Sequence, residues 1–158
     1  MVEIVRAHGL EIAYRRVGDG PPLVLVHGAA EDGRAWQPQL ALADEFTVVA
    51  WDEPGAGGSS DVPADFGLPD YARCLAALID AIGLGPAHVA GLSWGGTVAQ
   101  ELYRSRAGPA ASADLVRVLD AGHGRCLWER VPAPDDFTGA RSRSTARLFV
   151  PNHASVAR

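Results

Sequence analysis

Residues 87–100, AHVAGLSWGGTVAQ, place a single serine between glycines at the junction of two patterns. The run before Ser93 is apolar and typical of a buried strand, and the run after it has the spacing of a helix. A sharp turn from strand to helix exposes the intervening side chain and points the unpaired N–H groups of the first helical turn at the same spot. The stretch therefore predicts Ser93 as a nucleophile, with the backbone N–H of Trp94 as a donor to the developing oxyanion.

Strand and helix patterns alternate outward from this stretch. They predict a hairpin of strands at 2–7 and 10–17, further strands at 23–28, 46–52, 87–93 and 113–122, and helices at 34–45, 69–85 and 94–106. Alternation from residue 23 to about residue 122 favours a parallel sheet covered by helices on both faces. The predicted fold class is therefore α/β, with a mostly parallel sheet.

Length and texture predict one folded core with a different C-terminal segment. A chain of 158 residues has the size of a single domain. After residue 104 the sequence becomes rich in arginine, serine, alanine and proline and loses its periodicity. We therefore expect a core at 1–122 and a divergent or partly disordered segment at 123–158.

Composition argues against several classes of function. A net charge of −5 gives no electrostatic basis for binding nucleic acid or an anionic membrane surface. No apolar run reaches the roughly 20 residues of a membrane span, and the first residues lack a secretory signal. Cys74 and Cys126 suggest no disulfide framework. We expect a cytoplasmic protein without a metal site or cofactor.

Three ordered motifs carry a resemblance to a known family. They are LVLVHGAA at 23–30, VVAWDEPGAGGSS at 48–60 and HVAGLSWGG at 88–96. Together they resemble the α/β-hydrolase family, and the likeness covers about residues 10–105. The resemblance implies that Ser93 is the nucleophile and that the N–H groups of Ala29 and Trp94 form the oxyanion hole. It also implies that His27 is structural, and the glycine-rich turn after Asp52 favours a loop-bonding role for that carboxylate.

The acid and base of the expected triad have three interpretations. The family's order is Ser, then Asp or Glu, then His, but this chain resembles a member truncated after the elbow helix, with an incomplete fold. In one interpretation Asp120 is the acid and His153 the base. In a second, DAGHGRCLWERVP matches the family's C-terminal loop and His123 is the base. A third interpretation leaves the chain without a working base.

These observations predict a serine hydrolase that cleaves a carboxylic ester or related small-molecule acyl substrate. The alternative is a non-catalytic or inactive truncated member of the same fold, acting as a binding module or existing as a fragment. An early end to the sheet would also leave an edge strand open to self-association.

Overall fold

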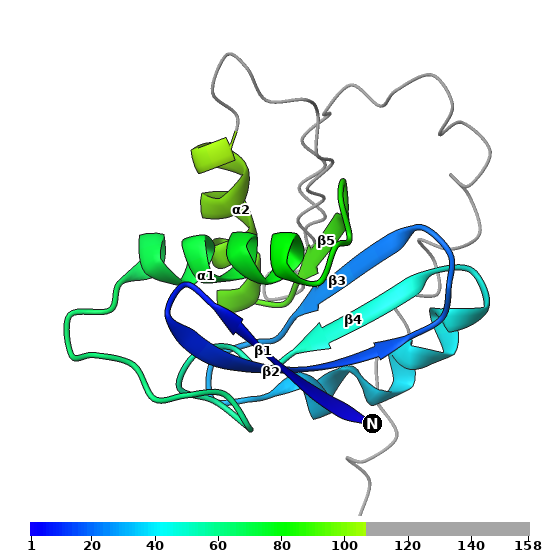
Figure 1. The fold of residues 1–158 in the computed structure, drawn as a ribbon, viewed down its shortest axis with the longest axis horizontal. Helices are drawn as coiled ribbons and strands as arrows, with labels where there is room; N and C mark the ends of the chain where they lie inside the picture. Colours follow the sequence, from blue (N-terminus) through cyan, green and yellow to red (C-terminus); the bar gives the residue numbers. More distant parts are fainter. Residues whose placement is uncertain (107–158) are drawn as a thin grey trace, which may run out of the picture.

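The structure, a computed structural model, describes residues 1–106 of the chain. These residues form a mixed sheet with the strand order β1-β2-β4-β3-β5 (Figure 1). The strands are β1 (Val2–Ala7), β2 (Leu10–Val17), β3 (Pro22–Val26), β4 (Thr47–Trp51) and β5 (His88–Gly91). The helical segments are η1 (Gly33–Asp44), α1 (Leu68–Ala81) and α2 (Trp94–Arg106).

The sheet combines an antiparallel edge with a parallel centre. β1 and β2 form the predicted hairpin, whose turn has φ of 49° at His8 and 84° at Gly9. Two successive residues with positive φ suit the twist of a two-residue hairpin turn. β2 then pairs antiparallel with β4, while β3 pairs parallel with β4 and with β5. The α/β class is confirmed, although the antiparallel share is larger than a mostly parallel sheet suggests.

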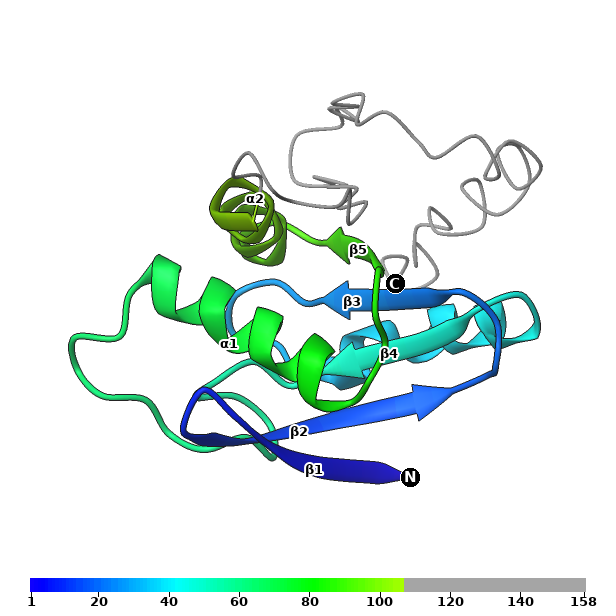
Figure 2. The ribbon, with the colours of Figure 1, turned by 45° about the horizontal axis from the view of Figure 1, so that its top comes forward.

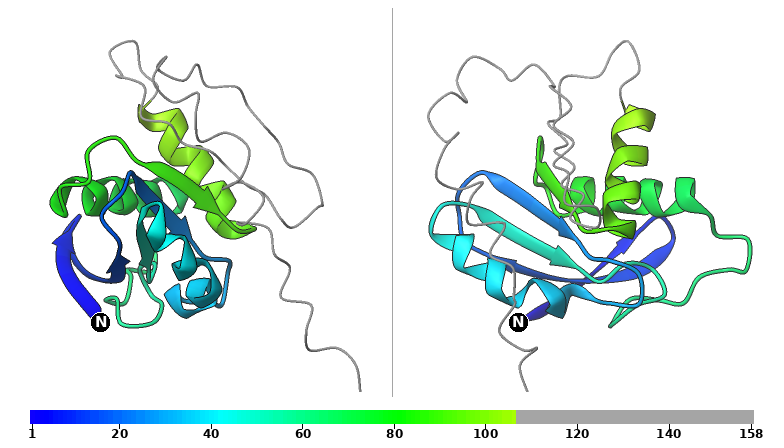
Figure 3. Two further views of the ribbon diagram at one scale, coloured as in Figure 1. Left: turned by 90° about the vertical axis from the view of Figure 1, so that its right-hand side faces the viewer. Right: turned by 180° about the vertical axis from the view of Figure 1, so that it is seen from behind.

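The strand order reverses at β3. From β3 the chain passes through η1 to β4 on one side, and then through α1 to β5 on the other side of β3. η1 covers one face of the sheet, and α1 and α2 cover the opposite face (Figure 3). Because β4, β3 and β5 are parallel, the loops that follow them emerge at one edge. Such a reversal point is where open α/β sheets bind ligands.

The predicted helix at 69–85 is α1, and local signals set both of its ends. Pro69 stands in the first turn, where its missing N–H costs nothing. The Asp70 carboxylate accepts a 2.9 Å hydrogen bond from the Gly67 N–H just before the helix. The helix gives way at Gly83, which has a φ of +67°. α1 lies across the sheet beside α2, and the two helices pack against each other (Figure 2).

The predicted helix at 34–45 is instead a run of 3₁₀ turns, η1. Its start is fixed by Asp32, whose side chain accepts from the Arg34 N–H at 2.8 Å. Pro38 lies inside the segment and has no N–H to donate. η1 buries Leu42 against the sheet, with Trp36 and Leu40 packed at the margin. The segment thus covers its face of the sheet in a different helical form from the expected one.

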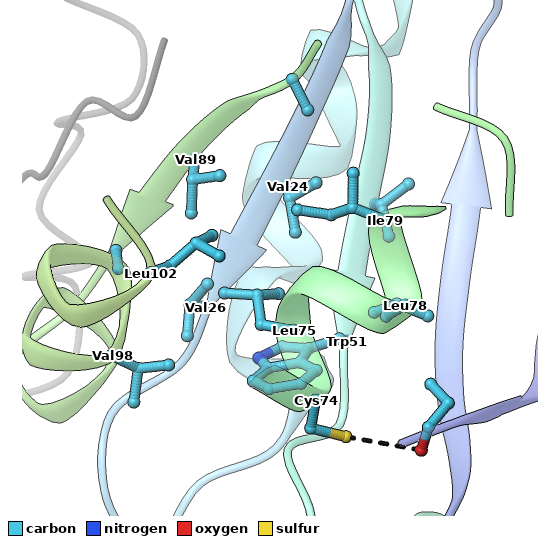
Figure 4. Packing of buried hydrophobic residues seen from close by; sticks show 14 of the residues in the cluster. Val24, Val26, Trp51, Cys74, Leu75, Leu78, Ile79, Val89, Val98 and Leu102 are labelled. Carbon is cyan, nitrogen blue, oxygen red and sulfur yellow. Dashed lines mark hydrogen bonds between the residues drawn. The ribbon is translucent and has the colours of Figure 1, made fainter. Parts of the chain in front are cut away.

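The core follows the two-residue period of the strands. Val24 and Val26 of β3 face α1 and α2, while Leu23 and Leu25 face η1. Leu75 of α1 is fully buried against the first pair (Figure 4). Burying one such side chain stabilises the fold by about 1.5–3 kcal/mol. The apolar cluster that includes Val24, Val26 and Leu75 thus holds α1 and α2 against the sheet, next to the loops that carry the candidate site.

The predicted strands at 23–28, 46–52 and 87–93 correspond to β3, β4 and β5. The strand expected at 113–122 and the segment at 123–158 lie outside the described residues.

Candidate functional site

The elbow, defined here as residues 91–95, joins β5 to α2 through a strained residue. β5 ends at Gly91 and α2 begins at Trp94. Between them, Ser93 is exposed and has a φ of 52°. A positive φ is uncommon for a residue with a Cβ atom and costs of the order of 1–3 kcal/mol. The predicted turn from strand to helix is confirmed, and it presents the Ser93 side chain to solvent.

The two glycines of the elbow allow its close approach to the sheet. A Cβ atom on Gly91 would overlap the carbonyl group of Gly95, and one on Gly95 would overlap the carbonyl oxygens of Val26 and His27. The Leu92 N–H donates to the Val26 carbonyl at 3.0 Å, which extends the pairing of β3 with β5 into the elbow. The G-x-S-x-G spacing thus has a steric cause at both ends.

The backbone N–H groups of Ala29, in the turn after β3, and of Trp94, at the start of α2, have no acceptor among residues 1–106. The turn is held by a 3.1 Å bond from the Gly28 N–H to the Glu31 carboxylate, and Ala30 has a φ of 62°. Free amides at a helix start can bind negative charge. Their assignment to an oxyanion hole stays a prediction.

His27 is committed to the structure of the same turn. Its ring is fully buried, and its Nε2 accepts from the Glu53 N–H at 3.0 Å. Nε2 is therefore unprotonated, and the ring proton lies on Nδ1, 2.9 Å from the Gly28 carbonyl that accepts it. Both ring nitrogens are thus occupied. This agrees with the structural role expected for His27 and leaves no lone pair for a catalytic base.

Asp52 fastens the loop after β4 to its neighbours. Its Oδ1 accepts from the Gly33 N–H at 2.8 Å and from Arg15 at 3.1 Å. Its Oδ2 accepts from the Gly58 N–H at 2.9 Å. The carboxylate therefore bonds loop amides, as the glycine-rich turn predicted.

Glu53 is a candidate site residue that the sequence analysis missed. It is 7% exposed although it directly follows Asp52 in a loop. The Trp94 indole Nε1–H donates to its Oε2 at 2.9 Å, and its Oε1 lies 4.0 Å from His27 Nδ1. Burial raises the pKa of this carboxyl from 4.5 to about 7, and the indole bond offsets part of the rise. A carboxyl group placed straight after a buried strand was the available signal.

An aromatic row lies beside the elbow. Trp94 meets Tyr71 edge to face with ring centroids 5.5 Å apart, and Tyr71 meets Phe66 in the same way at 4.9 Å. Tyr71 lies in the first turns of α1, so the row couples that helix to the start of α2. Burial raises the pKa of Tyr71, and the nearby Glu53 charge adds to the rise. Trp94 and Tyr71 are thus aromatic neighbours of the Glu53 carboxyl group.

The remaining predicted site residues, Asp120, His123 and His153, lie outside the described residues. Within residues 1–106 no cluster of His, Cys, Asp and Glu could hold a metal ion. No helix in that part of the chain is both long and apolar enough to cross a membrane.

Comparisons with known proteins bear on this geometry. A family model described as alpha/beta hydrolase fold matches residues 21–125. An (E)-2-((N-methylformamido)methylene)succinate hydrolase of Acinetobacter baylyi is 36% identical over 86 residues, which are 54% of this chain and 33% of that protein. A putative carbamate hydrolase, RutD, of Azorhizobium caulinodans is 35% identical over 127 residues, which are 78% of this chain and 44% of that protein.

Solved structures give the same picture. The N-acyl homoserine lactonase AidH is 29% identical, with a TM-score of 0.63 over 66% of this chain and 40% of that one. The chain thus spans less than half the length of each of these three relatives.

Proposed function

The chain belongs to the α/β-hydrolase fold family, and from this premise we propose that it is a serine hydrolase acting on a carboxylic ester or a related acyl compound. The observation that carries the proposal is the exposed Ser93, held at a φ of 52° between β5 and the first turn of α2. A strained turn of this kind is the setting in which a serine hydroxyl serves as a nucleophile.

The proposed reaction proceeds in two steps. Ser93 Oγ attacks the carbonyl carbon and gives its proton to a histidine, while the amides of Ala29 and Trp94 bind the negative oxygen. The tetrahedral intermediate then expels the alcohol, which takes the proton from the histidine, and an acyl-serine ester remains. Water hydrolyses that ester by the same route, which releases the acid and restores Ser93. His123 or His153 is the proposed base, and Asp120 is the acid if His153 serves.

The names of the relatives fit a carbonyl substrate. The three compared proteins are named as hydrolases of an N-methylformamido compound, of a carbamate and of an N-acyl homoserine lactone. Each of these compounds has a carbonyl carbon bonded to oxygen or nitrogen. An attack on such a carbon is the step that a serine beside free backbone amides promotes.

The proposal can be tested by labelling the nucleophile. We expect a fluorophosphonate probe to modify Ser93, as located by peptide mass spectrometry, and p-nitrophenyl butyrate to be hydrolysed. Ser93→Ala should abolish both. Ser105→Ala is the matched control, because Ser105 lies on the same helix and, among residues 1–106, its hydroxyl bonds only the Leu102 carbonyl. Circular dichroism should show that both variants are folded. A folded wild-type chain without label at Ser93 would refute the proposal.

A non-catalytic binding function is the second candidate, and one observation favours it. Within residues 1–106 no histidine is placed to act as the base for Ser93. His27 is committed at both ring nitrogens, His8 lies in the β1–β2 turn, and His88 begins β5 at the end remote from the elbow. Under this function the folded chain would bind acyl compounds without labelling or turnover.

A further inference from the structure

Glu53 is a buried acid that the proposed reaction does not use. Among the described residues its carboxyl group has a single hydrogen bond, from the Trp94 indole, and no cationic side chain pairs with it. Burying an uncompensated carboxyl group is costly. Packing alone therefore does not explain why a carboxyl group occupies position 53.

Glu53 contacts both segments that carry the free amides. Its backbone N–H bonds His27 Nε2 at 3.0 Å, and the His27 ring bonds the Gly28 carbonyl at 2.9 Å, one residue before Ala29. Its side chain bonds the Trp94 indole at 2.9 Å. Glu53, in the loop after β4, therefore links the turn after β3 to the first residue of α2.

We propose that Glu53 is a positioning residue that fixes the separation of the Ala29 and Trp94 amides by holding the turn after β3 and the start of α2 together. The link itself rests only on the contacts above. Its effect on catalysis rests on the proposed function. A misplacement of about 1 Å in such a donor pair can lower a rate by about 100-fold.

The protonation state of Glu53 should act on the same donors. The titratable groups that face it are His27 after β3 and Tyr71 on α1. The described residues place no cation beside it, so loss of its proton adds a negative charge to the group that bonds the side chain of Trp94, the residue whose N–H is a proposed oxyanion donor. That charge opposes the developing oxyanion. Because burial raises the pKa of the carboxyl to about 7, the effect should appear near neutral pH.

The link can be tested by nuclear magnetic resonance without any turnover. In the wild-type chain, the amide resonances of Ala29 and Trp94 and the Trp94 indole resonance should titrate together near pH 7. Glu53→Gln keeps an acceptor oxygen and should abolish the titration. Glu53→Leu removes the acceptor and should shift both amides. Glu101→Gln is the control, because Glu101 pairs with Arg104 on α2, and it should leave the titration unchanged. Resonances that stay fixed, or that titrate equally in Glu53→Gln, would overturn the proposal.

Labelling rates separate this inference from the proposed function. We expect Glu53→Leu to slow fluorophosphonate labelling of Ser93 by about 10–100-fold. Glu53→Gln should keep the rate at pH 6 and lose the decline above about pH 7. If the wild-type chain is not labelled at all, the proposed function fails, and the resonance titration still decides the role of Glu53. A Glu53→Leu variant that is folded and labels at the wild-type rate would overturn the positioning role.

Discussion

Replacing Glu53 with glutamine should remove a pH dependence from the stability of the fold. The folded carboxyl group has a pKa raised from 4.5 to about 7 by burial. In the unfolded chain the group ionises near its ordinary value. Between these two values the folded state holds a proton that the unfolded state has lost. The free energy of unfolding therefore falls as pH rises through this window, by about 1.4 kcal/mol per pH unit.

The magnitude follows from the size of the shift. A difference of about 2.5 pKa units corresponds to a total loss of about 3 kcal/mol, complete above the folded pKa. Integrating the linkage between about pH 5.5 and about pH 8.5 gives a loss of about 2 kcal/mol in that interval. Glutamine carries no titrating proton, so the variant should not show this share of the change.

Urea unfolding of the wild type and Glu53→Gln at these two pH values measures the effect. The difference in unfolding free energy between the two proteins should shift by about 2 kcal/mol in favour of the variant at the higher pH. Groups that titrate equally in both proteins cancel in this comparison, and Glu101→Gln shows the behaviour of a carboxylate that is paired with an arginine. If the difference in unfolding free energy between wild type and variant is the same at both pH values, the folded protein already has an ionised Glu53 at the lower pH. Burial would then not raise the pKa of this carboxyl group.

Three further predictions follow from the packing. Gly95→Ala should destabilise the fold by about 1–3 kcal/mol, because its Cβ would overlap the carbonyl oxygens of Val26 and His27. Thermal melts measure the loss, and Thr97→Ala on the same helix should change the melting temperature little; equal melting temperatures for the two variants would contradict the steric account. Asp52→Ala should lower the free energy of unfolding by about 3–5 kcal/mol, because the Arg15 side chain and two loop amides lose their acceptor. Urea unfolding measures this loss, and a smaller value would mean that water replaces the carboxylate. Burial raises the pKa of the Cys74 thiol to about 12, so peptide mapping should find it unmodified by iodoacetamide at pH 8 until denaturant is added; rapid native labelling would show that the core opens.

The elbow could be predicted from sequence because its constraints are local. Gly91 and Gly95 are required by contacts within a few residues and with the end of β3, and those contacts recur wherever a strand turns this sharply into a helix. The positive φ of Ser93 follows from the same geometry. The parallel centre was equally accessible, since its strands are apolar runs between helical patterns. Local pattern and tertiary packing agree at these positions.

The parts that sequence reasoning missed depend on distant contacts. η1 has apolar spacing that a helix would also have, and the 3₁₀ form emerges only in the packed segment with Pro38 inside it. Glu53 looks like a solvated loop residue until Trp94 and Tyr71, from α2 and α1, close over it. The roles of Asp120, His123 and His153 stay predictions, since those residues lie beyond the described part of the chain.

The reversal of strand order at β3 has a consequence for how this scaffold can diversify. The turn after β3, the loop after β4 and the elbow share one rim, yet each is rooted in a different strand. Exposed positions in the loop after β4, such as Gly55, Asp61 and Ala64, add little to the interior. Insertions there can change which ligands fit at this edge of the sheet, while the packing of the helices against the sheet is unchanged. The architecture thus allows ligand preference to evolve without a change in the stability of the fold.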